Sequence, residues 1–301
     1  MSIELSNITK LYGEQRAVNG ISFSIKTGEV VGFLGPNGAG KSTTMKMLTC
    51  YIPPSSGEAK VCGFNVMDDP MEVRKRVGYL PEHNPLYLDM YVKEFLAFVA
   101  GIHKLPNATA RVKEMIDLVG LGREQHKPIG ALSKGYRQRV GLAQAMIHDP
   151  EVLILDEPTS GLDPNQLVEI RELIRAIGRE KTVMLSTHIM QEVEAICSRV
   201  IIINRGEVVA DDAVSQLSRF RTDARKAVYA EFDSEVTAAQ LLAIEGVVEA
   251  VSAGAGWRLE GDVAVDLRRA VATWAQENGR LLYTLREDEQ KLEDVFKRLT
   301  K

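Results

Sequence analysis

A glycine-rich segment near the start of the chain has the residue types and spacing needed to bind phosphate. Residues 35–42, Gly-Pro-Asn-Gly-Ala-Gly-Lys-Ser, fit the pattern G-x-x-x-x-G-K-[ST]. An apolar run at residues 30–34 predicts a buried strand before it, and residues 43–48 predict a helix after it. Glycines let backbone N–H groups turn onto phosphate oxygens, and a helix N-terminus adds partial positive charge. The predicted phosphate-binding residues are Gly35, Pro36, Asn37, Gly38, Ala39, Gly40, Lys41, Ser42 and Thr43.

Lys41 and Ser42, at the end of this loop, differ in what their side chains can do. The ammonium group of Lys41 can reach the β- and γ-phosphates of a nucleotide, whereas the hydroxyl of Ser42 is a ligand for Mg²⁺. The ion bridges phosphate oxygens and offsets the charge that develops in phosphoryl transfer. The loop alone therefore predicts a nucleotide site, and it leaves ATPase, GTPase and kinase open.

Two adjacent carboxylates follow a second apolar run, at residues 152–155. Asp156 and Glu157 stand at the carboxyl end of that predicted strand, where open α/β sheets bind their ligands. Adjacent strand residues point to opposite sides, so we expect Asp156 to hold the metal ion and Glu157 to polarise the attacking water as general base. An isolated Asp-Glu pair would simply end a strand, and it is the phosphate loop that favours catalysis.

His188 follows a third apolar run, at residues 182–185, and is therefore expected at the same edge of the sheet. A lone histidine after a buried strand is more often structural than catalytic. Beside the phosphate loop and the carboxylate pair, we interpret His188 as a catalytic residue.

Apolar runs separated by helical patterns predict an α/β fold with a mostly parallel central sheet. Residues 3–26 alternate apolar and polar residues around Gly13 and Gly20, which predicts antiparallel strands at one edge that frame the nucleotide base. The four fully apolar runs lie at residues 30–34, 152–155, 182–185 and 200–203.

The segment at residues 71–145 lacks continuous strand-like runs and shows helical periodicity, notably at 92–102 and 110–119. We expect it to be a helical subdomain inserted into the α/β core.

A second, smaller domain is predicted after a polar stretch at residues 215–226, with the first domain spanning 1–220 and the second 224–301. Its elements have the βαββαβ order of a ferredoxin-like α+β unit, followed by a terminal helix at 292–299. The predicted strands are 227–232, 247–252, 256–259 and 281–286, and the predicted helices are 236–244 and 263–278.

Composition excludes several classes of function. The 301 residues are 45% hydrophobic, enough for a sizeable core, and the net charge of −4 argues against nucleic acid as the main partner. Three widely spaced cysteines suggest neither a metal site nor a disulfide framework. There is no secretory signal and no run near the roughly 20 apolar residues that cross a bilayer, so membrane work would need another chain as anchor.

Four motifs, in the same order, resemble those of the ABC ATPase family. The resemblance covers about residues 1–220 and implies a P-loop NTPase fold that binds ATP and Mg²⁺, hydrolyses ATP, and dimerises head to tail as a homodimer or heterodimer. It also implies an integral membrane permease as partner and a peripheral place on the cytoplasmic face of the cell membrane. The motifs are residues 35–42, Leu-Ser-Lys-Gly-Tyr-Arg-Gln-Arg at 132–139, Leu-Asp-Glu-Pro-Thr-Ser-Gly-Leu-Asp at 155–163, and Ser-Thr-His at 186–188.

The resemblance also implies roles for single residues. The signature loop, Ser133, Lys134, Gly135 and Tyr136, would contact the γ-phosphate bound by a second subunit, although alone it is equally a helix cap. Asp163 would belong to the D-loop, and would also cap a helix before Pro164. His188 would sense the γ-phosphate and orient Glu157, and Tyr12 would stack on adenine, although an isolated tyrosine is usually core.

The chain departs from the family pattern at three positions. Residues 77–80 resemble a strand of the family, and Glu82 stands in the loop after it, where the family usually carries glutamine. The carboxylate of Glu82 can coordinate Mg²⁺ while adding negative charge near the phosphates. Lys134 and Tyr136 replace the glycine and glutamine of the usual signature.

Residues 78–87 and 292–296 resemble a narrower group, the gliding-motility type (GldA) of the ABC-2 export class. Membership implies that a permease helix docks near Glu82 and residues 83–90. The candidate docking residues, which could equally be core, are Leu86, Tyr87, Leu88 and Met90.

The sequence argues against three other classes of function. A soluble ABC ATPase of DNA repair or translation would carry a long coiled-coil insert or tandem ATPase domains, and the sequence has neither. A nucleotide-dependent binding module without turnover would not need Glu157. A P-loop kinase or GTPase would lack the signature loop and His188, and the N-K-x-D motif of GTPases is absent.

Overall fold

The computed structural model describes residues 1–216, 225–262 and 265–287, and the chain divides into two compact units. The first unit spans Met1–Ser215 and the second continues from Gln216. Among the described residues, no helix is both long and apolar enough to cross a membrane.

The centre of the first unit is a six-stranded sheet in the order β10-β9-β3-β8-β7-β6. Five strands run parallel, and β10 pairs antiparallel with β9 through a turn at Arg205 and Gly206. The four fully apolar runs of the sequence are all strands of this sheet. The bounds are β3 (Val30–Leu34), β6 (Val77–Leu80), β7 (Val152–Asp156), β8 (Thr182–Thr187), β9 (Arg199–Asn204) and β10 (Glu207–Ala213).

A second sheet of the first unit is antiparallel, in the order β2-β1-β4-β5. The hairpin between its first two strands turns at Gly13, whereas Gly20 lies inside β2 at φ 62°, where an extra residue shifts the register. The bounds are β1 (Ile3–Tyr12), β2 (Gln15–Ile25), β4 (Ser56–Val61) and β5 (Phe64–Asn65).

One continuous core joins the two sheets. Helix α1 (Lys41–Leu48) contributes Met45 and Leu48 to it, beside Ile3 of the antiparallel sheet and Phe33 of the central sheet. The phosphate loop therefore begins and ends on buried elements, which fix its position.

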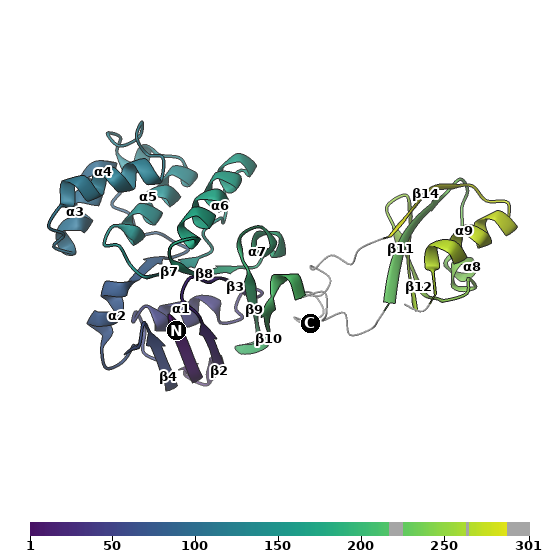
Figure 1. Cartoon of the computed structure of the whole chain (residues 1–301), viewed down its shortest axis with the longest axis horizontal. Helices are drawn as coiled ribbons and strands as arrows, with labels where there is room; N and C mark the ends of the chain where they lie inside the picture. The colour runs from purple at the N-terminus through teal and green to yellow at the C-terminus, as the bar shows by residue number, and fades with distance from the viewer. Residues whose placement is uncertain (217–224, 263–264, 288–301) are drawn as a thin grey trace. The chain divides into compact units, whose positions relative to one another are not determined.

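Helices α3, α4 and α5 cluster together (Figure 1). The segment at 71–145 that we expected to be a helical subdomain also contains β6, a strand of the central sheet, at the residues that resemble a strand of the family. This strand is only four residues long and includes Gly78, so it gives no continuous apolar run. The bounds are α2 (Pro70–Arg76), α3 (Val92–Ile102), α4 (Ala108–Leu118), a 3₁₀ turn (Ile129–Ala131), α5 (Lys134–Met146), α6 (Pro164–Gly178) and α7 (Met190–Ile196).

The described part of the second unit is an antiparallel sheet in the order β12-β13-β11-β14 with two helices, the split βαβ arrangement of a ferredoxin-like unit. Its own core includes Val228, Leu241, Leu259 and Val271. The bounds are β11 (Arg225–Phe232), α8 (Ala238–Leu242), β12 (Val247–Ala253), β13 (Gly256–Asp262), α9 (Leu267–Glu277) and β14 (Leu282–Glu287). The terminal helix predicted at 292–299 and the boundary at 220–224 lie outside the described residues.

All three cysteines are free thiols. Burial raises the pKa of Cys197 to about 12 and that of Cys62 to about 11, so neither is a reactive thiolate at neutral pH.

Candidate active site

A cleft of about 520 Å³ opens at the carboxyl end of the central sheet. It brings together residues that are far apart in the sequence, from the phosphate loop, the first hairpin and the ends of β6, β7 and β8. Its lining is Tyr12, Gln15, Ala17, Asn37, Gly38, Gly40, Lys41, Ser42, Thr43, Glu82, Glu157, Ser160 and His188.

Two glycines give the phosphate loop its curvature. Gly38 and Gly40 have φ of 79° and 107°, values that favour glycine. A Cβ on Gly40 would lie 2.5 Å from Ala17 O, and one on Gly35 would lie 2.4 Å from Ile203 O. The loop thus packs closely on its neighbours, and the N-terminus of α1 faces the cleft.

Lys41 is buried and aimed into this loop. Its Nζ donates to Gly35 O at 2.8 Å and Pro36 O at 3.2 Å, and it lies 3.5 Å from Glu157 Oε1. A buried ammonium group held by carbonyls and a carboxylate is positioned in advance to meet the oxygens of a phosphate.

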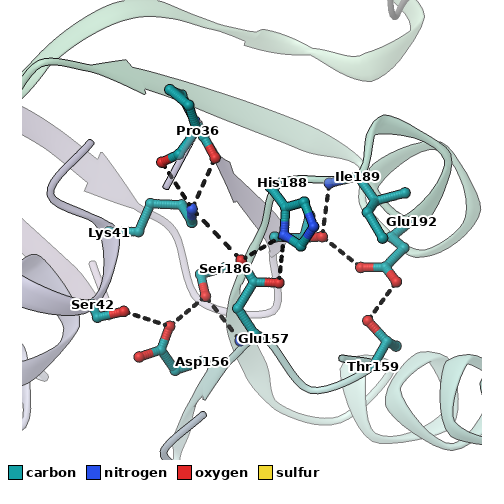
Figure 2. A network of polar contacts seen from close by, with 12 residues as sticks. Pro36, Lys41, Ser42, Asp156, Glu157, Thr159, Ser186, His188, Ile189 and Glu192 are labelled. Carbon is teal, nitrogen blue, oxygen red and sulfur yellow. Dashed lines mark hydrogen bonds and ion pairs between the residues drawn. The ribbon is translucent and has the colours of Figure 1, made fainter. Parts of the chain in front are cut away.

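Asp156 is 2% exposed and accepts hydrogen bonds from two serines (Figure 2). Ser42 Oγ donates to its Oδ1 at 3.1 Å, and Ser186 Oγ donates to the same atom at 2.6 Å. Glu82 lines the cleft beside Ser42. A hydroxyl and two carboxylates are hard oxygen donors of the kind that Mg²⁺ prefers, so these residues fit the ion.

Glu157 leaves the strand with a left-handed backbone, at φ 49°. Its N–H donates to Ser186 Oγ at 2.9 Å, and its carboxylate oxygens lie 3.0 and 3.1 Å from His188 Nδ1. Asp156 and Glu157 do diverge, as the sequence predicts. The physical reason is not the predicted strand alternation, because β7 ends at Asp156. The left-handed backbone of Glu157 turns its side chain toward Lys41 and His188 instead.

Tyr12 ends β1 at the edge of the cleft and is 49% exposed. The ammonium group of Lys10 lies 5.4 Å from its ring centroid. The ring is thus available to a flat ligand at the entrance of the site.

Ser133 and Asp163 lie outside this cleft and both cap helices. Ser133 Oγ accepts the N–H of Tyr136 at 3.4 Å at the start of α5, and Asp163 Oδ1 accepts the N–H groups of Asn165 and Gln166 at 3.1 and 3.0 Å at the start of α6. None of residues 133–136 lines the cleft of its own chain.

Comparison with known proteins identifies the family. The sequence profile described as "ABC transporter" matches residues 18–160. The bacitracin transport ATP-binding protein BcrA of Bacillus licheniformis is 38% identical over 235 residues, covering 76% of this chain and 74% of BcrA. The chain belongs to the ATP-binding proteins of ABC transporters.

Further relatives agree with this assignment. The ABC transporter ATP-binding protein NatA of Bacillus subtilis (strain 168) is 40% identical over 206 residues, 67% of this chain and 84% of NatA. A solved dimer of an ATP-binding cassette in a post-hydrolysis state, bound to ADP and Pi, matches with a TM-score of 0.65 and 26% identity over 70% of this chain and 98% of that one. This ABC protein is thus an ATPase of a transport system, and the relatives favour transport over DNA repair or translation.

The proposed docking residues of this ABC protein are divided between core and surface. Leu86 is 9% exposed and belongs to the core, whereas Tyr87 and Leu88 are about half exposed. The ring of Tyr87 packs on Phe95 and Phe98 of α3, with centroids 5.9 and 5.8 Å away.

The sequence does not predict the roles of several polar residues at the ABC site. In the sequence Ser186 is only one member of the Ser-Thr-His motif, whereas in the structure it joins Asp156 to the backbone of Glu157. Thr159, Thr187 and Glu192 form a buried hydrogen-bonded group beside His188. The run Ser-Thr-His shows hydroxyls beside the histidine, but their partners come from other elements.

Proposed function

We propose that this chain powers an ABC exporter by ATP hydrolysis in which Glu157 activates the attacking water. The observation that supports this most is the convergence of three side chains in the cleft. In the carboxylate of Glu157, Oε1 lies 3.5 Å from Lys41 Nζ and Oε2 lies 3.0 Å from His188 Nδ1.

Each of the three has a distinct part in the proposed reaction. The loop N–H groups and Lys41 bind the phosphates and stabilise the charge that develops on the γ-phosphoryl group. Glu157 accepts a proton from the attacking water as general base. His188 hydrogen-bonds Glu157 and holds it in place, and its 45% exposed side chain can reach a ligand in the cleft.

Ser42 and Asp156, with Glu82 beside them, would hold Mg²⁺. When bound, the ion supplies neutralisation of phosphate charge. The carboxylate of Glu82, in place of the usual amide, adds negative charge at this position.

ABC cassettes form dimers and work with membrane permeases. We propose that Ser133, Lys134, Gly135 and Tyr136, with Asp163, complete the cleft of a second ATPase subunit in a head-to-tail homodimer or heterodimer. Their position outside their own cleft supports this. Two helix N-termini, at α5 and α6, would then face the partner's nucleotide.

The permease partner is proposed to dock at residues 83–90, where Tyr87 and Leu88 are exposed. This partner would hold the chain at the cytoplasmic face of the membrane. The names of the relatives include bacitracin transport and Nod factor export, which support an export role. Assignment to the gliding-motility group stays a hypothesis based on the sequence of residues 78–87 and 292–296, the second of which lies outside the described residues.

Replacing Glu157 with glutamine tests the proposal. We expect Glu157→Gln to abolish ATP hydrolysis while ATP still induces dimers, and Lys41→Ala to weaken ATP binding itself. Glu194→Gln, which changes an exposed carboxylate on α7, should hydrolyse ATP normally. Normal turnover by Glu157→Gln would rule out Glu157 as the base.

A further inference from the structure

Glu192 is a buried carboxylate that the proposed reaction does not use. It lies in the first turn of α7 and is 1% exposed. Removing a carboxylate from water is costly unless its oxygens are hydrogen-bonded. Oε1 accepts from Thr159 Oγ1 and Oε2 from Thr187 Oγ1, both at 2.5 Å. These are short, charge-assisted hydrogen bonds between groups excluded from solvent.

The two threonines belong to the two segments that carry the catalytic pair. Thr159 lies two residues after Glu157, and Thr187 immediately precedes His188. Figure 2 shows Glu192 between Thr159 and the loop that contains His188. The carboxylate of Glu192 therefore ties the segment after β7 to the last residue of β8.

A further hydrogen bond extends this link across His188. The N–H of Ile189 donates to Thr187 Oγ1 at 3.1 Å, so the same hydroxyl that donates to Glu192 also closes a local turn around the histidine. The backbone on both sides of His188 is thus fixed by Thr187, and Thr187 is fixed by Glu192.

Such a link matters because packing does not hold the ring of His188. Its side chain is 45% exposed, whereas that of Glu157 is 9% exposed. The 3.0 Å distance between His188 Nδ1 and Glu157 Oε2 must therefore be set by the backbone segments that carry them. A displacement of about 1 Å at a catalytic group can lower the rate about a hundredfold.

We propose that Glu192 is a positioning residue for ATP hydrolysis, which sets the distance between Glu157 and His188 by holding Thr159 and Thr187. This inference rests on the proposed roles of Glu157 and His188. Glu192 does not line the cleft, so its loss should slow hydrolysis and leave nucleotide binding nearly unchanged.

Glu192→Met is the main test, measured as steady-state ATP hydrolysis by the full-length chain. Methionine keeps the length of the side chain and removes both acceptors. We expect kcat to fall between about tenfold and a hundredfold while KM for ATP changes less than about twofold. The amide of Glu192→Gln can still hydrogen-bond both threonine hydroxyls, provided that one hydroxyl accepts from the amide NH₂ instead of donating. This variant should therefore retain most of the turnover.

Thr159→Val and Thr187→Val test the same link from its other ends, with little change in shape. Each should lower kcat, and neither should lower it further when added to Glu192→Met, because the three residues act as one unit. If Glu192→Met does not fold, these two variants decide the matter.

Thr182→Val is the control for a purely structural effect. Thr182 is 1% exposed at the other end of β8, where its hydroxyl bonds Gly28 and Ser2. This variant should lower the free energy of unfolding and leave kcat unchanged.

The outcomes separate this inference from the proposed function. Normal turnover by Glu157→Gln would overturn the proposed function. An inactive Glu157→Gln with normal turnover by Glu192→Met, or by both valine variants, would overturn only the positioning role. An equal loss of kcat in Thr182→Val would also overturn it.

Discussion

The hydroxyl of Ser186 connects the carboxylate of Asp156 to the backbone of Glu157. Its Oγ donates to Asp156 Oδ1 at 2.6 Å and accepts the N–H of Glu157 at 2.9 Å. The side chain is fully buried on β8, so it reaches both groups from a neighbouring strand. The left-handed backbone of Glu157 is stabilised by this contact.

We therefore expect Ser186→Ala to impair both stability and catalysis. The change leaves a buried N–H and a buried carboxylate each without one partner, which should lower the free energy of unfolding by about 1–3 kcal/mol. Turnover should fall about tenfold or more, because Glu157 loses its anchor. Urea unfolding and ATP hydrolysis assays measure the two effects. Ser198→Ala, at an exposed serine bonded to Val30 O, is the control, and equal effects in both variants would contradict this role.

The site was predictable where its chemistry is local in sequence. The phosphate loop is one contiguous motif, and Glu157 and His188 each follow an apolar run that is a strand of the sheet. The positioning residues were not predictable in the same way. Glu192 and Thr159 are 33 positions apart, and a buried glutamate among helical residues looks like any solvated one until the fold brings its partners together.

At the scale of elements, β6 is the strand that links the central sheet to the helical cluster. Gly78 allows α5 to approach it closely, since a Cβ there would lie 2.1 Å from Ala145 O and 2.6 Å from Leu153 Cδ2. The strand leads directly into Pro81 and Glu82, so its position also sets one wall of the cleft.

Gly78→Ala should separate these elements. A methyl group that meets a backbone oxygen cannot be accommodated by a rotamer change. We therefore expect the free energy of unfolding to fall by about 1–3 kcal/mol. Gly101→Ala, inside α3 where a Cβ meets nothing within 4 Å, should instead be neutral or stabilising. Thermal or urea unfolding compares the two. Equal stability of both variants would show that β6 and α5 can move apart freely.

Two stacked histidines at the same junction should make the stability of the fold depend on pH. The rings of His103 and His148 lie 4.1 Å apart, and His148 Nε2 lies 3.1 Å from Val77 O on β6. Burial lowers the pKa of His148 to about 4 and also lowers the pKa of His103. As pH falls below about 6.5, the unfolded chain takes up these protons while the folded chain does not, so stability should decrease toward pH 4.

His148→Gln tests this dependence. Between pH 7 and pH 4.5, the free energy of unfolding of the wild type should fall by about 1–2 kcal/mol more than that of the variant. This amount takes into account that the partial exposure of His148 to solvent weakens the effect. Urea titrations across this range measure it. His126→Gln, at an exposed histidine, should keep the wild-type slope, and a wild-type slope in His148→Gln as well would contradict the assignment.

Helices and strands were predictable in proportion to the length of their pattern. The amphipathic period of residues 92–102 predicts α3 with its observed bounds. The four residues of β6 give too short a pattern, and the close approach that Gly78 permits appears only in three dimensions. Leu86 illustrates the same limit, because an apolar residue in a loop has no period that distinguishes core from surface.

At the scale of the whole molecule, the two units have separate cores. The core of the first includes Phe33 and Met45, and that of the second includes Leu259 and Val271. All the residues that line the candidate ATP cleft belong to the first unit. The second unit is thus not needed to build the site.

A chain truncated after Asp223 should therefore fold and bind ATP with an affinity within about twofold of the full-length chain. Calorimetry should show that the truncated chain lacks a transition present in the full-length chain, because each core unfolds as its own cooperative unit. Leu259→Asp, which places a charge in the core of the second unit, should remove the same transition and leave ATP affinity unchanged. A tenfold loss of affinity in both variants would show that the second unit contributes to nucleotide binding. A loss in the truncated chain alone would instead assign the contribution to residues beyond that core.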